Sequence, residues 1–128
     1  YKALKTEQGV FTTPPYSAAI KPLWRFADEA AAIKSSEAIW ERFIEYRNQS
    51  DFIGMDISRK FIQMGRTRSL RYALRRSGRK YDPSSGKEME RTGEVYDVEK
   101  SKGARVFETV LERCWSDIIY SEAFEAFR

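Results

Sequence analysis

Residues 51–64, which read DFIGMDISRKFIQM, decide the fold of this chain. The apolar side chains of this stretch recur at helical spacing on two sides: Ile53, Ile57, Phe61 and Met64 on one, and Met55 and Ile62 on the other. The polar side chains form one narrow stripe: Asp56, Arg59, Lys60 and Gln63. A helix that is apolar around most of its circumference lies inside its domain. The stretch therefore predicts the central helix of a mainly α domain.

The segment before this stretch predicts a long surface helix from about Asp28 to Gln49. Its small and apolar residues repeat every three or four positions: Ala32, Ser36, Ile39, Trp40, Phe43 and Tyr46. Asp28 is expected to cap this helix, and Ser50 or Asp51 to cap the central one. We expect the apolar stripe to pack on the central helix.

After the central helix, Gly65 predicts a break near Met64. Thr67 is placed to cap a short third helix from Arg68 to Ser77, which Gly78 would end. One face of this short helix would be apolar or small, with the following members: Leu70, Ala73, Leu74 and Ser77. The sequence thus predicts two helices joined by a glycine turn.

The C-terminal part predicts a loop followed by helices. Residues 82–98 are expected to form the loop, because they begin with Pro83-Ser84-Ser85-Gly86 and are mostly polar. A long helix is expected over about Glu99–Ile119, with this apolar stripe: Phe107, Val110, Leu111, Cys114 and Ile118. Ser121 with Glu125 predicts the capping of a short terminal helix.

Residues 1–26 predict an irregular segment, because Pro14-Pro15 and Pro22 interrupt any helix there. Gln8–Thr12 is expected to form a short strand. The segment also carries apolar and aromatic residues that predict packing on the helical core: Tyr16, Ile20, Leu23, Trp24 and Phe26. A chain of 128 residues has the size of one domain. The predicted fold is a small single-domain helical bundle, with four parts: 1–26 the N-terminal segment, 28–81 the helical core with a basic helix, 82–98 the loop, and 99–128 the C-terminal helices.

The positive charges of the chain are concentrated in one segment. Lys and Arg number 23 and Asp and Glu number 19, which gives a net charge of +4. Between Arg59 and Lys80 there are nine basic residues and no acidic one, so the rest of the chain has fourteen basic and nineteen acidic residues. This separation predicts an anionic partner, most simply a nucleic acid.

The predicted binding face lies on the basic helix, where several Arg side chains can neutralise successive phosphates. Tyr72 within this face is expected to stack on an unpaired base. The predicted nucleic-acid-binding residues are Lys60, Arg66, Arg68, Arg71, Tyr72, Arg75, Arg76, Arg79 and Lys80. The sequence leaves open whether the partner is DNA, RNA or another polyanion. As alternatives, the arginines meet an acidic protein surface in an assembly module, or they pair with carboxylates of the chain itself.

Several enzyme classes are excluded by composition. The chain has no His and one Cys, so it lacks the residues of a zinc site and of a Ser–His or Cys–His nucleophile pair. No EF-hand or Walker spacing is present. We therefore predict no catalytic residue, metal or cofactor. A third hypothesis, after binding and assembly, is a metal-dependent phosphoester hydrolase that combines Asp51 or Asp56 with Lys60.

Cysteine usage and hydropathy bear on the compartment. Cys114 lies on a predicted apolar stripe and is expected to be an inert core thiol. A single Cys cannot form an intrachain disulfide. No apolar run approaches the roughly 20 residues that span a membrane. We expect an intracellular, cytoplasmic protein with no membrane partner.

Residues 51–68 also carry a resemblance, which extends to four other pieces: Glu7-Gln8-Gly9-Val10, residues 15–26, Arg71-Tyr72-Ala73 and Gly78-Arg79-Lys80-Tyr81. Together they resemble domain-of-unknown-function family 4385, an uncharacterised family of bacteria and tailed phages whose members are often labelled only as cytoplasmic proteins. The resemblance covers about residues 7–81. It implies an intracellular α-helical domain and supports a role for residues 59–81, but it implies no activity.

Overall fold

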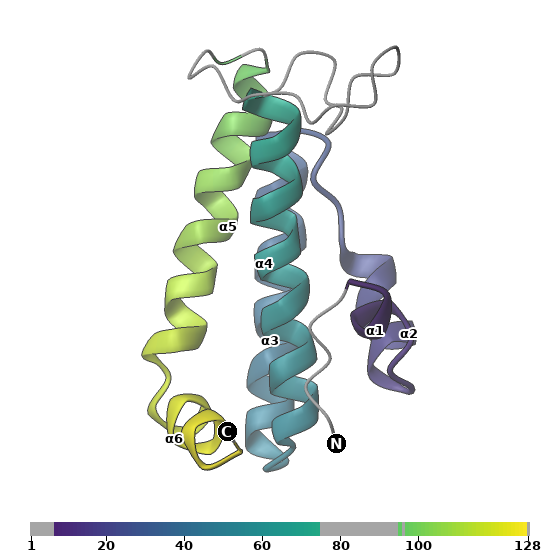
Figure 1. Ribbon diagram of the computed structural model, residues 1–128, viewed down its shortest axis with the longest axis vertical. Helices are drawn as coiled ribbons and strands as arrows, with labels where there is room; N and C mark the ends of the chain where they lie inside the picture. Colours follow the sequence, from purple (N-terminus) through teal and green to yellow (C-terminus); the bar gives the residue numbers. More distant parts are fainter. Residues whose placement is uncertain (1–6, 75–94, 96, 128) are drawn as a thin grey trace, which may run out of the picture.

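The computed structural model describes residues 7–74, 95 and 97–127, and its main body is a bundle of three long helices (Figure 1). These helices are α3 (Glu29–Asn48), α4 (Phe52–Leu74) and α5 (Val98–Ser116). Each of the three contacts the other two along its length. The short helix α6 (Ile118–Phe127) packs across one end of the bundle, and the N-terminal segment lies along one side of α4. The predicted mainly α bundle is confirmed.

Helix α3 begins and ends where the sequence predicts. The Asp28 carboxylate accepts a hydrogen bond from the Ala31 N–H at 2.8 Å and caps the helix. The chain then reverses over Gln49, Ser50 and Asp51, and Ser50 takes the left-handed backbone conformation with φ 56°. Asp51 caps α4, since its Oδ1 accepts the Gly54 N–H at 3.1 Å. A connection this short makes α3 and α4 antiparallel neighbours.

Helix α4 is continuous from Phe52 to Leu74, so the predicted break at Gly65 and the separate helix from Arg68 are wrong. Gly65 is buried in the middle of α4 and faces α5, where a Cβ atom would lie 2.6 Å from the Phe107 ring. The glycine allows the two helices to approach closely rather than ending one of them. Thr67 does not cap a helix, because its hydroxyl donates to the Gln63 carbonyl within α4.

Gly65→Ala is expected to destabilise the fold by about 1–3 kcal/mol, although alanine favours a helix over glycine by about 1 kcal/mol. The Phe107 ring is fully buried, so a shift of the ring would disturb its neighbours in the close-packed core. Gly103→Ala on α5 is the matched control, because a Cβ there meets its nearest neighbour, the Ala32 Cβ, at an ordinary 3.4 Å. Urea denaturation measures the free energy of unfolding of both variants and of the native protein. A Gly65→Ala protein as stable as the native one would contradict this packing.

The N-terminal segment is more regular than predicted. It contains α1 (Glu7–Phe11), α2 (Tyr16–Ile20) and the 3-10 helix η1 (Lys21–Leu23), so the predicted strand over Gln8–Thr12 is wrong. In the described part of the chain there is no other strand that could pair with it. Pro22 fits at the start of η1, where a missing N–H leaves no hydrogen bond unmade. As predicted, the segment packs on the helical core.

The C-terminal helices also differ from the prediction at their junction. Helix α5 ends at Ser116, and Asp117 takes an extended conformation before α6 begins. Asp117 caps α6 in place of the predicted Ser121, because its Oδ1 accepts the Tyr120 N–H at 2.9 Å. Ile118, predicted on the apolar stripe of the long helix, lies on α6 and is 71% exposed. Most of the predicted loop over residues 82–98 lies outside the described residues.

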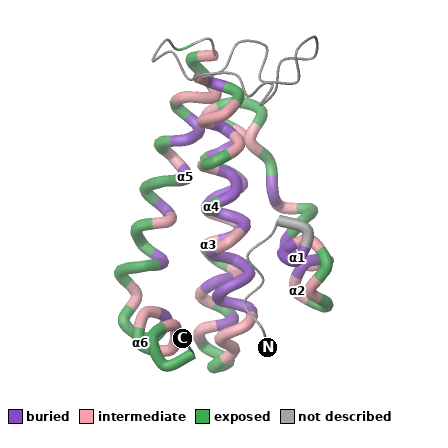
Figure 2. The backbone as a smooth tube through the Cα atoms, viewed as in Figure 1, coloured by how far each residue is buried: buried purple, intermediate pink, exposed green. Residues whose placement is uncertain are grey.

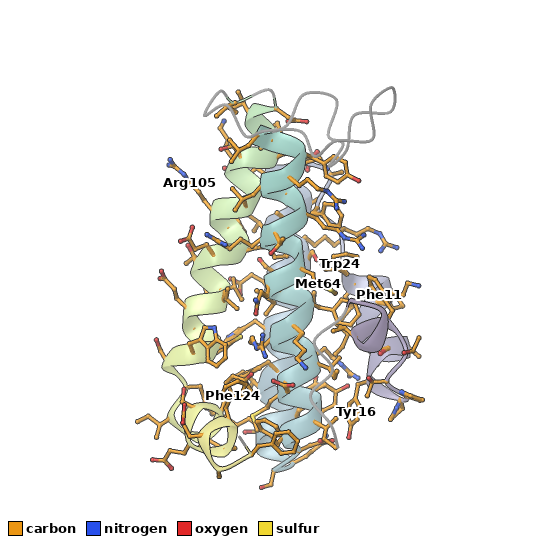
Figure 3. All side chains as sticks on the ribbon, viewed as in Figure 1. Phe11, Tyr16, Trp24, Met64, Arg105 and Phe124 are labelled. Carbon is orange, nitrogen blue, oxygen red and sulfur yellow. The ribbon has the colours of Figure 1, made fainter. Side chains whose placement is uncertain are left out.

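The core runs along the axis of the bundle, where α3, α4 and α5 face one another (Figure 2). Its largest fully buried aromatic side chains come from four different helices: Phe43, Phe61, Phe107 and Tyr120. Most residues of the predicted central helix are buried, as expected from its wide apolar arc. The outer face of α6 is exposed at Ile118 and Ile119. The aromatic side chains labelled in Figure 3 show that rings also lie outside the bundle axis, on both flanks of α4.

Candidate functional site

Two cations of the basic segment are engaged inside the protein. Asp56, on α4, has no exposed surface, and its Oδ1 accepts a hydrogen bond from Arg59 Nη2 at 3.0 Å. Its Oδ2 lies 3.1 Å from Lys60 Nζ. Arg59 also donates to Gln63 and lies over the Trp115 ring at 4.8 Å. Lys60, a predicted binding residue, is thus paired with a buried carboxylate, and its side chain is 13% exposed.

Tyr120 of α6 completes this buried network. Its hydroxyl donates to Asp56 Oδ1 at 2.7 Å and accepts from Arg59 Nε at 2.8 Å. Burial raises the pKa of Tyr120, so the phenol keeps the proton that it donates to Asp56. The network joins α4 to α6, and we assign it a structural role.

The carboxylates considered for a hydrolase are both in use. Asp56 belongs to the buried network, while Asp51 caps α4 and accepts the Tyr16 hydroxyl at 2.8 Å. That hydrogen bond, together with burial, raises the pKa of Tyr16 to about 12. Among the described residues no group of three or more His, Cys, Asp or Glu side chains could hold a metal ion. Cys114 is buried as predicted, and burial raises its pKa to about 12, so the thiol is protonated at neutral pH.

A second group of cations lies against aromatic rings on the flank of α4 that bears the N-terminal segment. These cations and rings come from α1, η1, the segment after η1, α4 and α5, and together we call them the cation–aromatic surface. Its cations are Lys21, Arg25, Arg68, Arg71 and Lys100. Its rings are Phe11, Trp24, Phe26 and Tyr72. Two of these rings, Phe11 and Trp24, are labelled in Figure 3 beside α4.

The lower half of the cation–aromatic surface is centred on Arg68. Its guanidinium lies over the Trp24 ring at 5.0 Å and over the Phe11 ring at 5.6 Å. Lys21 Nζ lies over the same Phe11 ring at 5.3 Å. Such contacts between cations and ring faces stabilise by about 0.5–1 kcal/mol at exposed sites. They hold the cations at fixed places on the surface.

The upper half is centred on Tyr72, which stacks on Phe26 with 6.5 Å between ring centroids and 23° between planes. Arg71 lies over the Tyr72 ring at 5.2 Å. Lys100 Nζ lies 5.1 Å from the Phe26 centroid and 5.6 Å from that of Tyr72, and it donates to the Phe26 carbonyl at 2.7 Å. Since Trp24 and Phe26 are also in contact, the rings and cations form one continuous row.

Four charges of this row are available to an external anion. Within the described ranges, no carboxylate lies within 4.0 Å of the cationic group of any of these four residues: Lys21, Arg25, Arg71 and Lys100. Lys21 and Arg25 are exposed, and Tyr72 is 37% exposed. The surface thus offers positive charge beside a partly exposed ring.

The predicted binding residues divide into three groups. Arg68, Arg71 and Tyr72 lie together on the cation–aromatic surface. Lys60 is in the buried network, and Arg66 lies 3.9 Å from Glu108 on the α5 side. The remaining four lie outside the described residues: Arg75, Arg76, Arg79 and Lys80.

The part of the surface that comes from outside α4 was not predicted from the sequence. Lys21, Arg25 and Lys100 were not assigned to it, the rings of Trp24 and Phe26 were expected to pack on the core, and Phe11 was given no role. One signal for them is the run Trp24-Arg25-Phe26, in which a cation alternates with two aromatic residues.

Comparison with protein families bears on the whole chain. The family model for a domain of unknown function, DUF4385, matches residues 1–128. The chain belongs to this family. Membership in DUF4385 confirms the resemblance seen in the sequence and assigns no activity. No curated protein and no solved structure matches the chain. Of the helices that the structure describes, none has the length and apolar character needed to cross a membrane.

Proposed function

We propose that this protein binds single-stranded nucleic acid through the cation–aromatic surface and does not catalyse a reaction. The observation that carries the proposal is the continuous row from Lys21 to Tyr72, in which cations alternate with aromatic rings. Proteins that bind single strands without sequence preference combine these two elements: cations contact the phosphates, and aromatic side chains stack on the bases.

The arrangement fits a single strand better than a duplex. In a duplex the bases stack on one another, so their faces are closed to a side chain, whereas an unpaired base can stack on an exposed ring. Tyr72 is 37% exposed, and a base would stack on its ring by displacing one of the groups that lie against it, such as Arg71. Arg25 and Lys21 extend the positive charge along the same flank, where they can neutralise further phosphates.

An acidic protein surface is the competing partner. The cations of the row would attract it as well, because complementary charge acts on any polyanion. The partly exposed ring favours nucleic acid, since the carboxylate side chains of Asp and Glu carry no aromatic ring that could stack on Tyr72.

Fluorescence anisotropy with three probes of matched charge separates these partners: a single-stranded oligonucleotide, a duplex and a polyglutamate. We expect binding to fall in that order at low salt. Equal affinity for polyglutamate and the single strand would support the assembly module instead, and no binding to either nucleic acid at low salt would refute the proposal.

Tyr72→Ala is expected to weaken single-strand binding by roughly 1–3 kcal/mol, which corresponds to about 5- to 150-fold, and to change duplex binding little. The stacked ring is lost while the cations remain. Tyr72→Phe is the matched control, because it keeps the ring and removes only the hydroxyl. Equal losses on single strand and duplex would mean that Tyr72 only supports Phe26 and the local fold.

A further inference from the structure

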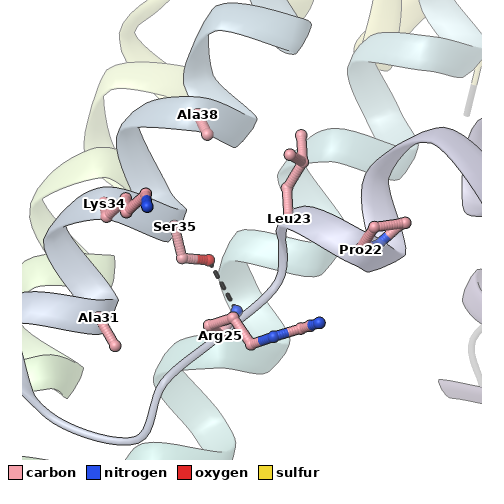
Figure 4. A pocket seen from close by; sticks show the side chains of 7 residues that line it. All are labelled: Pro22, Leu23, Arg25, Ala31, Lys34, Ser35 and Ala38. Carbon is pink, nitrogen blue, oxygen red and sulfur yellow. Dashed lines mark hydrogen bonds between the residues drawn. The ribbon is translucent and has the colours of Figure 1, made fainter.

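A pocket of about 420 Å³ opens between the N-terminal segment and α3, next to the cation–aromatic surface (Figure 4). Pro22 and Leu23 form one wall, and the small side chains of α3 form the other: Ala31, Ser35 and Ala38. Arg25 and Lys34 lie at its edge. Pockets that bind small molecules have volumes of about 300–1,000 Å³ and are lined mainly by apolar side chains.

The two walls of the pocket are fixed to each other. The Arg25 N–H donates to Ser35 Oγ at 2.9 Å, and Figure 4 shows this bond bridging the extended segment and α3. The side chain of Ser35 is buried at 3% exposure. Its O–H donates to no acceptor in the described part of the chain, and so it can serve a ligand.

The edge of the pocket is positively charged. Arg25 and Lys34 are exposed, and neither has a described carboxylate within 4.0 Å of its cationic group. The Arg25 guanidinium donates to the Trp24 carbonyl at 2.6 Å and to the Lys21 carbonyl at 3.5 Å. An apolar slot with a hydroxyl and two cations suits a ligand with one planar apolar part and one anionic part.

We propose that this pocket binds one nucleotide, with its base between Leu23 and the alanines of α3 and its phosphate at Arg25 and Lys34. Trp24 and Arg25 connect the pocket to the cation–aromatic surface, so a nucleotide of a bound strand can enter it. If the nucleotide belongs to a bound strand, the inference rests on the proposed function. If it is a free nucleotide, the inference stands alone, because a free nucleotide also has a base and a phosphate.

The test is an NMR titration of the protein with adenosine monophosphate, and in parallel with adenosine and with inorganic phosphate. We expect adenosine monophosphate to shift the amide signals of the pocket residues at millimolar concentration, and both fragments to bind at least tenfold more weakly. Ala38 is half-buried in the α3 wall of the pocket, and Ala38→Leu, which fills part of the pocket, should weaken the binding of adenosine monophosphate at least tenfold. Ala30→Leu, on an exposed position of the same helix outside the pocket, should leave it unchanged.

The outcomes separate this inference from the proposed function. Absence of pocket shifts, or equal binding of inorganic phosphate, overturns the inference even if the protein binds a single strand. If adenosine monophosphate shifts the amide signals of the pocket residues but the protein binds no strand, the inference is supported with a free nucleotide as the ligand. The failure to bind a strand then refutes the proposed function. If the native protein binds a strand, the strand affinity of the Ala38→Leu protein identifies the source of the nucleotide. A loss of strand affinity of fivefold or more means that the nucleotide belongs to the strand. An unchanged strand affinity means that the pocket binds a free nucleotide.

Discussion

Asp56→Ala is expected to lower the free energy of unfolding by about 3–5 kcal/mol. Asp56 is fully buried and is the anion shared by Arg59 and Lys60, whose side chains are 8% and 13% exposed. Without it, two cations with little exposed surface lose the anion that they share, and the Tyr120 hydroxyl loses its acceptor. Urea denaturation followed by circular dichroism measures the loss.

Glu45→Ala is the control for this variant. It breaks the Arg42–Glu45 pair, which has the same 3.0 Å separation as the Arg59–Asp56 pair but side chains that are 35% and 55% exposed. An exposed pair contributes at most about 1 kcal/mol. Similar losses for Asp56→Ala and Glu45→Ala would show that the buried network does not hold α6 to α4.

Changing Arg68, Arg71 and Lys100 together to Gln is expected to weaken single-strand binding roughly 100-fold at 0.1 M salt, if each cation contacts one phosphate. The three cations lie on rings of the cation–aromatic surface. Stability should fall by no more than about 1 kcal/mol for each cation lost, which thermal melting of the same protein checks. Fluorescence anisotropy measures the affinity.

The control variant removes three positive charges elsewhere, by changing Arg42, Arg105 and Arg113 to Gln. Arg42 and Arg113 pair with glutamates on exposed surface, and Arg105 points away from the bundle on α5 (Figure 3). Both triple variants have the same net charge. If they lose affinity equally, binding follows the net charge of the protein, and the cation–aromatic surface is not the site.

The sequence was sufficient for the long helices because their signals are local. The wide apolar arc of residues 51–64 and the caps at Asp28 and Asp51 depend on residues within one or two turns. The prediction of a helix break at Gly65 was wrong because the signal for this residue is not local. Its role is set by Phe107, a residue 42 positions away whose ring fills the space that a Cβ would need.

The candidate site was predicted in part, for a similar reason. The cations of α4 are visible in the sequence as a charge run, but the rings that hold Arg68 lie in the N-terminal segment. The burial of Arg59 and Lys60 had a local signal, because Asp56 precedes them by three and four residues and so lies on the same helix face. The partner Tyr120 had none, since only the packing of α6 brings it to Asp56.

The most direct test of the central claim is the salt dependence of single-strand binding. Five cations belong to the described cation–aromatic surface, and if all contact phosphates the slope of log affinity against log salt should be about −3.5. In the variant in which Arg68, Arg71 and Lys100 are changed to Gln, the magnitude of this slope should be smaller than in the native protein by about 2. Binding that is absent at low salt, or a slope that is the same in the native protein and the variant, would contradict the account.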